Sequence, residues 1–164
     1  MQGIAVRKAT MEDLATLNLF QQGIADAERV FDPAIKDGAV QYYDIASMLT
    51  ADDTRFVIAQ AGTRIVGCGY ARIEAAKHYL KHSVHAYLGL MYVDPQYRGH
   101  SVNLAIIEAL KDWSLSRGVG EMRLEVYRDN IAAIKAYEKA GFGQWVIEMR
   151  WAQNDGGGRQ KLLK

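Results

Sequence analysis

The 164-residue sequence has one cysteine, two prolines and no long apolar run. The single cysteine, Cys68, excludes an internal disulfide and a cysteine-based metal cluster. Because no stretch of 18 or more apolar residues occurs, we expect no membrane span. The N-terminus also lacks the apolar region of a signal peptide. These absences predict a protein of the reducing cytoplasm.

The sequence also has little net charge. Its 20 basic and 19 acidic side chains give +1, which provides no overall field to attract nucleic acid. The hydrophobic share of 49% and the length suit one globular domain with a real core. We predict that this domain covers residues 1–153. Residues 154–164 are predicted to be a flexible tail, because three consecutive glycines there cost entropy to order.

Hydrophobic periodicity predicts strands and helices along the whole chain. The expected strands are residues 4–9, 55–60, 64–73, 83–93, 122–127 and 142–151, the last as one strand or a pair. The expected helices are residues 11–25, 39–49, 102–117 and 131–140. A hairpin at residues 61–63 favours antiparallel pairing, whereas strand–helix–strand crossovers favour parallel pairing. We therefore predict an α/β fold with a mixed central sheet of about six or seven strands and four flanking helices.

A strand, a tight turn and a helix follow one another over residues 91–109. The turn contains Arg98, Gly99, His100 and Ser101. A helix that starts after such a turn presents free backbone N–H groups, and its dipole is positive at that end. This arrangement binds anions, most often phosphates. The turn is therefore predicted to bind a phosphorylated ligand.

Two motifs carry a resemblance to a known family. Residues 96–101 (QYRGHS) resemble the Q/R-x-x-G-x-G/A pyrophosphate loop of the GNAT superfamily of acyl-CoA-dependent N-acetyltransferases. Residues 130–142 (NIAAIKAYEKAGF) resemble the Asn, Ala and Tyr-Glu-Lys-x-Gly-Phe signature of the same family. The chain departs from the pattern at Ser101, where the family usually has Gly or Ala, and at Asn103, where it often has a further glycine. The resemblance covers nearly the whole chain in element order and implies a single-domain GNAT-like fold.

The resemblance implies acetyl-CoA as the acyl donor and a primary amine of a small molecule or peptide as the acceptor, with direct transfer in a ternary complex. By resemblance, the amide of Val93 binds the pantetheine arm and the amide of Met91 donates to the thioester carbonyl. Asn130 and Tyr137 are implied coenzyme contacts. The pyrophosphate would lie along the backbone of Arg98, Gly99, His100, Ser101, Val102 and Asn103.

Tyr137 is the expected general acid. A tyrosine, with an ordinary pKa of about 10, can donate to a departing thiolate, whose thiol has a pKa of roughly 8.5. No motif assigns the general base. Glu74 is our named candidate, and the alternatives are His85, Tyr87, Glu28 and a water relay.

The acceptor is expected between residues 28–38 and 75–83. We expect no metal, since no acidic partner completes a site with His78, His82 and His85. We also expect no nucleic-acid or membrane partner. A homodimer through Trp145–Trp151 is a further expectation. The alternative to an enzyme is an acyl-CoA-binding sensor or interaction module with little catalysis.

Overall fold

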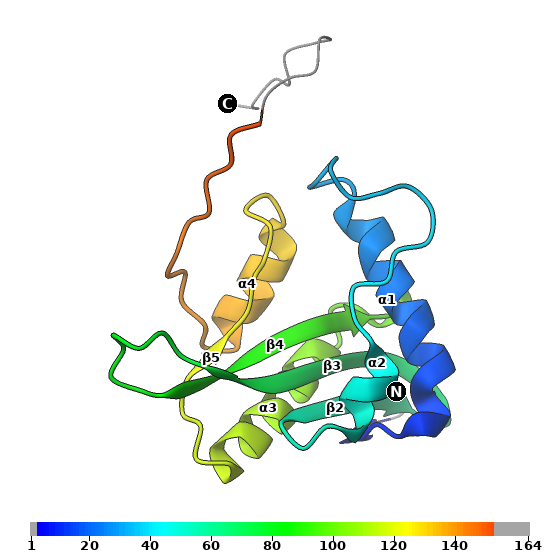
Figure 1. The fold of residues 1–164 in the computed structure, drawn as a ribbon. Helices are drawn as coiled ribbons and strands as arrows, with labels where there is room; N and C mark the ends of the chain where they lie inside the picture. Colours follow the sequence, from blue (N-terminus) through cyan, green and yellow to red (C-terminus); the bar gives the residue numbers. More distant parts are fainter. Residues whose placement is uncertain (1–2, 153–164) are drawn as a thin grey trace.

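The structure is a computed structural model that describes residues 3–152 (Figure 1). The predicted tail, residues 154–164, lies outside the described residues. Two short 3-10 helices, η1 (Met11–Asp13) and η2 (Pro95–Tyr97), accompany the longer elements. Those elements are β1 (Ile4–Lys8), α1 (Leu14–Glu28), α2 (Ile45–Thr50), β2 (Thr54–Ala61), β3 (Arg64–Ala75), β4 (Val84–Val93), α3 (Val102–Ser116), β5 (Met122–Arg123) and α4 (Ile131–Lys139).

The strands form one sheet in the order β1-β2-β3-β4-β5. The first three pairings are antiparallel, and β4 pairs with β5 in parallel. This mixed sheet with four α-helices confirms the predicted α/β fold class. The parallel pairing follows from the crossover through α3, which carries the chain back to the same end of the sheet.

Two apolar layers cover the two faces of the sheet. Alternate residues of β2 point to opposite faces, so Val57 packs in a core with α3 while Phe56 packs in a core with α1 and α2. The α3 layer contains Val102, Ile106, Leu110 and Trp113, which recur at helical spacing. The sheet is thus buried on both sides, and its ends and edges are left to carry a site.

A bulge interrupts β4 close to Gly89. Tyr70 pairs with Gly89, but Cys68 pairs with Tyr92, so Leu90 and Met91 together oppose a single residue of β3. Leu90 takes a left-handed backbone conformation, with φ of 48°. The extra residue changes the direction of every amide that follows it in β4.

The predicted number of strands was wrong. In the described residues the sheet has five strands rather than six or seven, because residues 142–152 form no strand. A strand needs a lateral hydrogen-bonding partner, and these residues have no backbone hydrogen bond of that kind within the described chain. The strand expected at residues 122–127 is also shorter, with Met122 and Arg123 alone paired to β4.

The second helix begins later than predicted, at Ile45 rather than near residue 39. Backbone amides of the residues before Ile45 instead donate hydrogen bonds to side chains of α1. Val40 N donates to Gln22 Oε1 at 2.9 Å, and Tyr43 N donates to Gln21 Oε1 at 2.8 Å. Residues 39–44 are therefore held against α1 outside any helix. Asp44 then caps α2 by accepting a hydrogen bond from the Ser47 amide.

Candidate functional site

β4 and β5 stay together over only two residue pairs. Ala86 pairs with Met122 and Tyr87 pairs with Arg123. From there to Val93, β3 is the only strand that pairs with β4 in the described part of the chain. In the described part of the chain, the edge of residues 88–93 that faces away from β3 therefore has no strand partner. Such an edge offers backbone donors and acceptors to an extended, peptide-like ligand.

The bulge decides which amides face this open edge. The Ala86 amide donates toward the β5 side, to Glu121 O at 2.9 Å, whereas the Asp94 amide donates to Val66 O of β3 at 2.8 Å. In a regular strand these two amides would point the same way, because an even number of residues separates them. The bulge reverses the alternation. Counting back from Asp94, the amides of Val93 and Met91 point away from β3.

The junction between η2 and α3 has an unusual backbone. Gly99 and Ser101 are both left-handed, with φ of 79° and 62°. Ser101 is the N-cap residue of α3 and makes no side-chain cap hydrogen bond within the described structure. The first α3 amides therefore have no intrahelical partner and remain free to donate to an anion. Arg98 is exposed beside them and adds a guanidinium.

Asn130 begins α4 as a cap. Its Oδ1 accepts a hydrogen bond from Ala133 N at 3.2 Å, which satisfies an amide in the first turn of the helix. Tyr137 lies two turns further along this helix and packs edge-on against Phe142, with 6.1 Å between ring centroids. Burial, together with the negative charge of Glu28, raises the pKa of Tyr137 to about 12. The phenol is therefore protonated at neutral pH.

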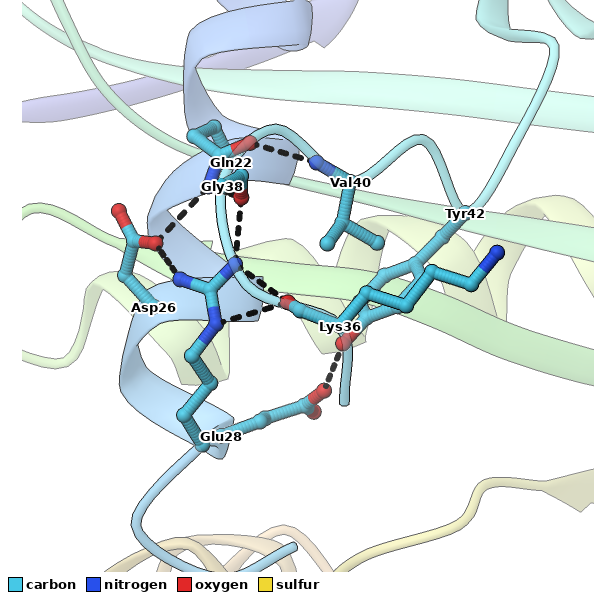
Figure 2. A network of polar contacts seen from close by, with 8 residues as sticks. Gln22, Asp26, Glu28, Lys36, Gly38, Val40 and Tyr42 are labelled. Carbon is cyan, nitrogen blue, oxygen red and sulfur yellow. Dashed lines mark hydrogen bonds and ion pairs between the residues drawn. The ribbon is translucent and has the colours of Figure 1, made fainter. Parts of the chain in front are cut away.

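Glu28 ends α1 beside the following loop, residues 29–44, whose first part borders the expected acceptor region (Figure 2). Tyr42 donates its hydroxyl hydrogen to Glu28 Oε2 at 3.0 Å. Burial raises the pKa of Glu28, while the hydrogen bond from Tyr42 acts in the opposite direction. Arg29 holds the loop in place by donating to the carbonyls of Lys36 and Gly38.

A second carboxylate, Asp32, follows Glu28 closely in the chain. It accepts hydrogen bonds from Tyr127 Oη at 3.3 Å and from Arg150 at 2.9 Å. The Arg150 hydrogen bond is the main reason that the pKa of Asp32 lies below its ordinary value. Tyr127 also stacks on Phe31, with ring centroids 6.0 Å apart. The end of α1, the approach to α4 and the C-terminal residues thus meet around Asp32.

Glu74, the candidate base named from the sequence, lies near the end of β3. Its carboxylate pairs with Arg72, and its Oε2 is 3.8 Å from His85 Nε2 on the neighbouring strand. Burial is the main cause that lowers the pKa of His85, whose Nδ1 has no partner within the described residues. Burial also raises the pKa of Tyr87 well above its ordinary value, with Glu125 adding to the shift. The base candidates Glu74, His85 and Tyr87 therefore lie on adjacent strands.

Three side chains at this end of the sheet were not singled out from the sequence: Asp32, Tyr42 and Tyr127. Tyr42 lies in a loop where the sequence predicted a helix, and Tyr127 is distant in sequence from Asp32. No spacing in the chain connects them. The 29–44 loop brings them together, because it contacts α1 through Tyr42 and the segment before α4 through Asp32 and Tyr127.

Two further findings concern other classes of site. Among residues 3–152, no group of three or more His, Cys, Asp or Glu side chains is arranged to hold a metal ion. His82 instead lies 3.2 Å from Glu121. None of the helices in this part of the chain is both long enough and apolar enough to cross a membrane.

Comparison with known proteins agrees with this geometry. The sequence profile of the Acetyltransferase (GNAT) family matches residues 20–142. A relative is Acetyltransferase SG1711 of Sodalis glossinidius, which is 33% identical over 99 residues. That match covers 58% of this chain and 62% of the relative, which is less than two thirds of its length.

Solved structures share the fold at low sequence identity. A tetramutant of the BH1408 protein of Bacillus halodurans superposes with a TM-score of 0.80 at 15% identity, covering 91% of this chain and 99% of that one. AAC(6')-Iy in complex with the bisubstrate analogue CoA-S-monomethyl-acetylneamine gives a TM-score of 0.68 at 19% identity, covering 93% and 99%. The profile match covers well over half of the sequence and ends at Phe142, the last residue of the second motif. The chain therefore belongs to the GNAT acetyltransferase family.

Proposed function

We propose that this protein is an N-acetyltransferase that moves the acetyl group of acetyl-CoA to a primary amine of a small molecule or peptide. The observation that carries the proposal is the continuous backbone surface from the open edge of β4 to the free amides at the start of α3. Its first part suits an amide-containing arm and its second part suits a pyrophosphate. The complex of AAC(6')-Iy with a bisubstrate analogue that contains CoA supports the same ligand class.

The transfer is proposed to be direct, within a ternary complex. The neutral amine nitrogen attacks the thioester carbonyl carbon, and the Met91 amide donates to the oxygen on which negative charge develops. One such donor typically contributes a few kcal/mol. The carbon–sulfur bond then breaks, and the thiolate leaves. Tyr137 donates its hydroxyl hydrogen to that sulfur, a role that suits a phenol that is protonated at neutral pH, and the phenolate regains a proton as the new amide nitrogen loses one.

The acceptor is proposed to enter between α1, the 29–44 loop and the end of β3. The carboxylate of Glu28, which accepts a hydrogen bond from Tyr42, lies in this region and suits an acceptor that carries positive charge. Glu74 remains the proposed base that takes the proton of the ammonium group. Glu28 is the second candidate for the base. It is half-buried, and its charge raises the pKa of Tyr137, so it acts electrostatically on the proposed acid. The reaction is proposed to take place in the cytoplasm, in keeping with a lone, free and buried Cys68.

The function is tested with the full chain, acetyl-CoA and a panel of amines that includes an aminoglycoside, free amino acids and peptides with free N-termini. Release of the coenzyme thiol in the presence of one amine class supports the enzyme. Acetyl-CoA binding without thiol release across the panel would instead support the acyl-CoA-binding module. The observation that favours an acyl-CoA-binding module is that Ser101 and Asn103 depart from the family's pyrophosphate-loop pattern.

Tyr137→Phe tests the proposed acid. We expect turnover to fall by at least about 10-fold, because the departing thiolate loses its hydrogen-bond donor, while the Kd for acetyl-CoA changes by less than about 2-fold. Equal turnover in wild type and Tyr137→Phe across the pH range would remove Tyr137 from the mechanism.

Glu74→Gln and Glu28→Gln together test the proposed base. Removal of the base should lower kcat/KM by about 100-fold or more and abolish the fall in rate at acidic pH. The variant at the residue that is not the base should still lose activity at acidic pH, as the wild type does. Wild-type pH profiles in both variants would assign the proton transfer to water.

A further inference from the structure

Cys68 lies on β3 beside the bulge of β4. Its side chain is fully buried in the core that β2 and β3 form with α1 and α2. Its Sγ donates a hydrogen bond to the carbonyl oxygen of Leu90 at 3.4 Å. Burial raises the pKa of this thiol well above its ordinary value, so the group keeps the hydrogen that it donates. Cys68 is therefore a fixed hydrogen-bond donor to the bulge and an unreactive thiol.

The carbonyl that accepts this hydrogen bond belongs to the peptide group that joins Leu90 to Met91. A peptide group is planar and trans, so its C=O and its N–H point in opposite directions. The Leu90 carbonyl is directed to Cys68 on β3. The Met91 amide therefore points away from that strand, toward the open edge of β4. The alternation counted back from Asp94 gives the same direction.

Glycines on both sides of Cys68 leave space for the bulge. A Cβ atom at Gly67 would lie 2.8 Å from the carbonyl oxygen of Tyr92, so a side chain there would force the backbone of β4 to move. A Cβ atom at Gly69 would lie 2.6 Å from Met91 Sδ and would displace that side chain. The residues from Gly67 to Gly69 thus match the shape of the bulge, and the thiol between the two glycines binds its peptide group.

Leu90 needs such support because its backbone is strained. It is buried and has φ of 48°, a region that a residue with a Cβ atom rarely adopts. Strained backbone persists where the surrounding structure holds it, and it is concentrated at functional sites. The hydrogen bond from Cys68 acts directly on this backbone. Its loss would let the peptide group rotate and would change the direction of the Met91 N–H.

We propose that Cys68 is a positioning residue for acetyl transfer, because its thiol orients the Met91 amide and strengthens it as the donor to the thioester oxygen. The orientation comes from the planar peptide group. The added strength comes from polarisation, since a hydrogen bond accepted by the C=O of a peptide group makes its N–H a better donor. Such a donor acts mainly on the charge that develops in the transition state. This role rests on the proposed function and extends it to a side chain that acts through another residue.

Cys68→Ala removes the thiol donor, and Ile58→Val is the matched control. Ile58 pairs with Cys68 across β2 and β3 and is buried in the same core, so each variant leaves a small cavity there. We expect kcat for amine acetylation to fall about 3- to 5-fold in Cys68→Ala, while the Kd for acetyl-CoA changes by less than about 2-fold. Ile58→Val should keep the wild-type kcat. Cys68→Ser retains a hydroxyl donor and should recover most of the lost kcat.

Nuclear magnetic resonance of the full chain without coenzyme supplies a second measurement that needs no activity. The resonances of the Leu90 carbonyl carbon and the Met91 amide nitrogen should move upfield in Cys68→Ala, because the peptide group loses polarisation, but not in Ile58→Val. A wild type that releases no thiol with any amine would refute the proposed function, and these two resonances would then decide whether Cys68 orients the peptide group. Unchanged resonances in Cys68→Ala overturn the proposal. A kcat of Cys68→Ala equal to that of Ile58→Val, or to that of Cys68→Ser, also overturns it.

Discussion

Burial acts on two side chains of the proposed site with different consequences. Tyr137 loses water, and its hydroxyl therefore keeps its proton through the neutral pH range. Glu28 also loses water, and its carboxylate becomes a better proton acceptor than an exposed glutamate. Each change suits the role proposed for the residue, but a buried carboxylate costs stability when it is ionised.

Glu28→Gln tests that cost. The pKa of Glu28 is raised in the folded state, so the folded chain binds the proton more tightly and loses stability as pH rises from the unfolded pKa through the folded one. Glutamine removes the charge, and its amide oxygen can still accept from Tyr42. The variant should therefore melt at a higher temperature than wild type at pH 8, with no difference below about pH 4, where the carboxyl is protonated in both states. An unchanged melting temperature at pH 8 would show that Glu28 is well solvated.

Elements, rather than single side chains, define the coenzyme surface. The bulge in β4 turns two amides toward the edge that β5 leaves open, and the chain then passes directly into the start of α3. The extended arm and the pyrophosphate of the coenzyme would thus be bound by consecutive backbone groups of one strand–turn–helix unit. This is why substitution of side chains at Met91 or Val93 is a weak test of their role.

Ser101→Gly tests the backbone at the start of α3. Ser101 has φ of 62°, which costs a residue with a side chain about 1–2 kcal/mol, whereas glycine pays a smaller entropy cost. We expect the free energy of unfolding in urea to rise by about 0.5–1 kcal/mol, without weaker acetyl-CoA binding. Gly99→Ala is the matched variant with the opposite expected effect, because Gly99 is also left-handed, with φ of 79°. The free energy of unfolding of this variant should fall by about 1 kcal/mol. A loss of stability in Ser101→Gly would mean that the serine side chain stabilises the turn.

Across the whole molecule, the features that were predicted correctly from the sequence are those that depend on residues close together in the chain. The turn at Arg98–Ser101 was recognised because its residues are adjacent in the chain. The delayed start of α2 was not predictable from periodicity, because Gln21 and Gln22 of another helix take the amides of the preceding loop.

The cluster around Asp32 was missed for a similar reason. Tyr127 and Arg150 reach Asp32 from distant parts of the chain, and no spacing predicts that tertiary contact. The predicted number of strands was wrong because the alternation at Trp145–Trp151 indicates a strand face but does not identify a strand that could pair with it. Local patterns therefore predicted the proposed coenzyme surface better than the proposed acceptor side.

The most direct test of the central claim is amide hydrogen exchange of the full chain with and without acetyl-CoA. If the open edge of β4 and the start of α3 bind the coenzyme, exchange should slow at residues 88–93 and 98–104, including the amides of Met91 and Val93. Binding of acetyl-CoA with unchanged exchange in both of these ranges would contradict the proposed coenzyme surface.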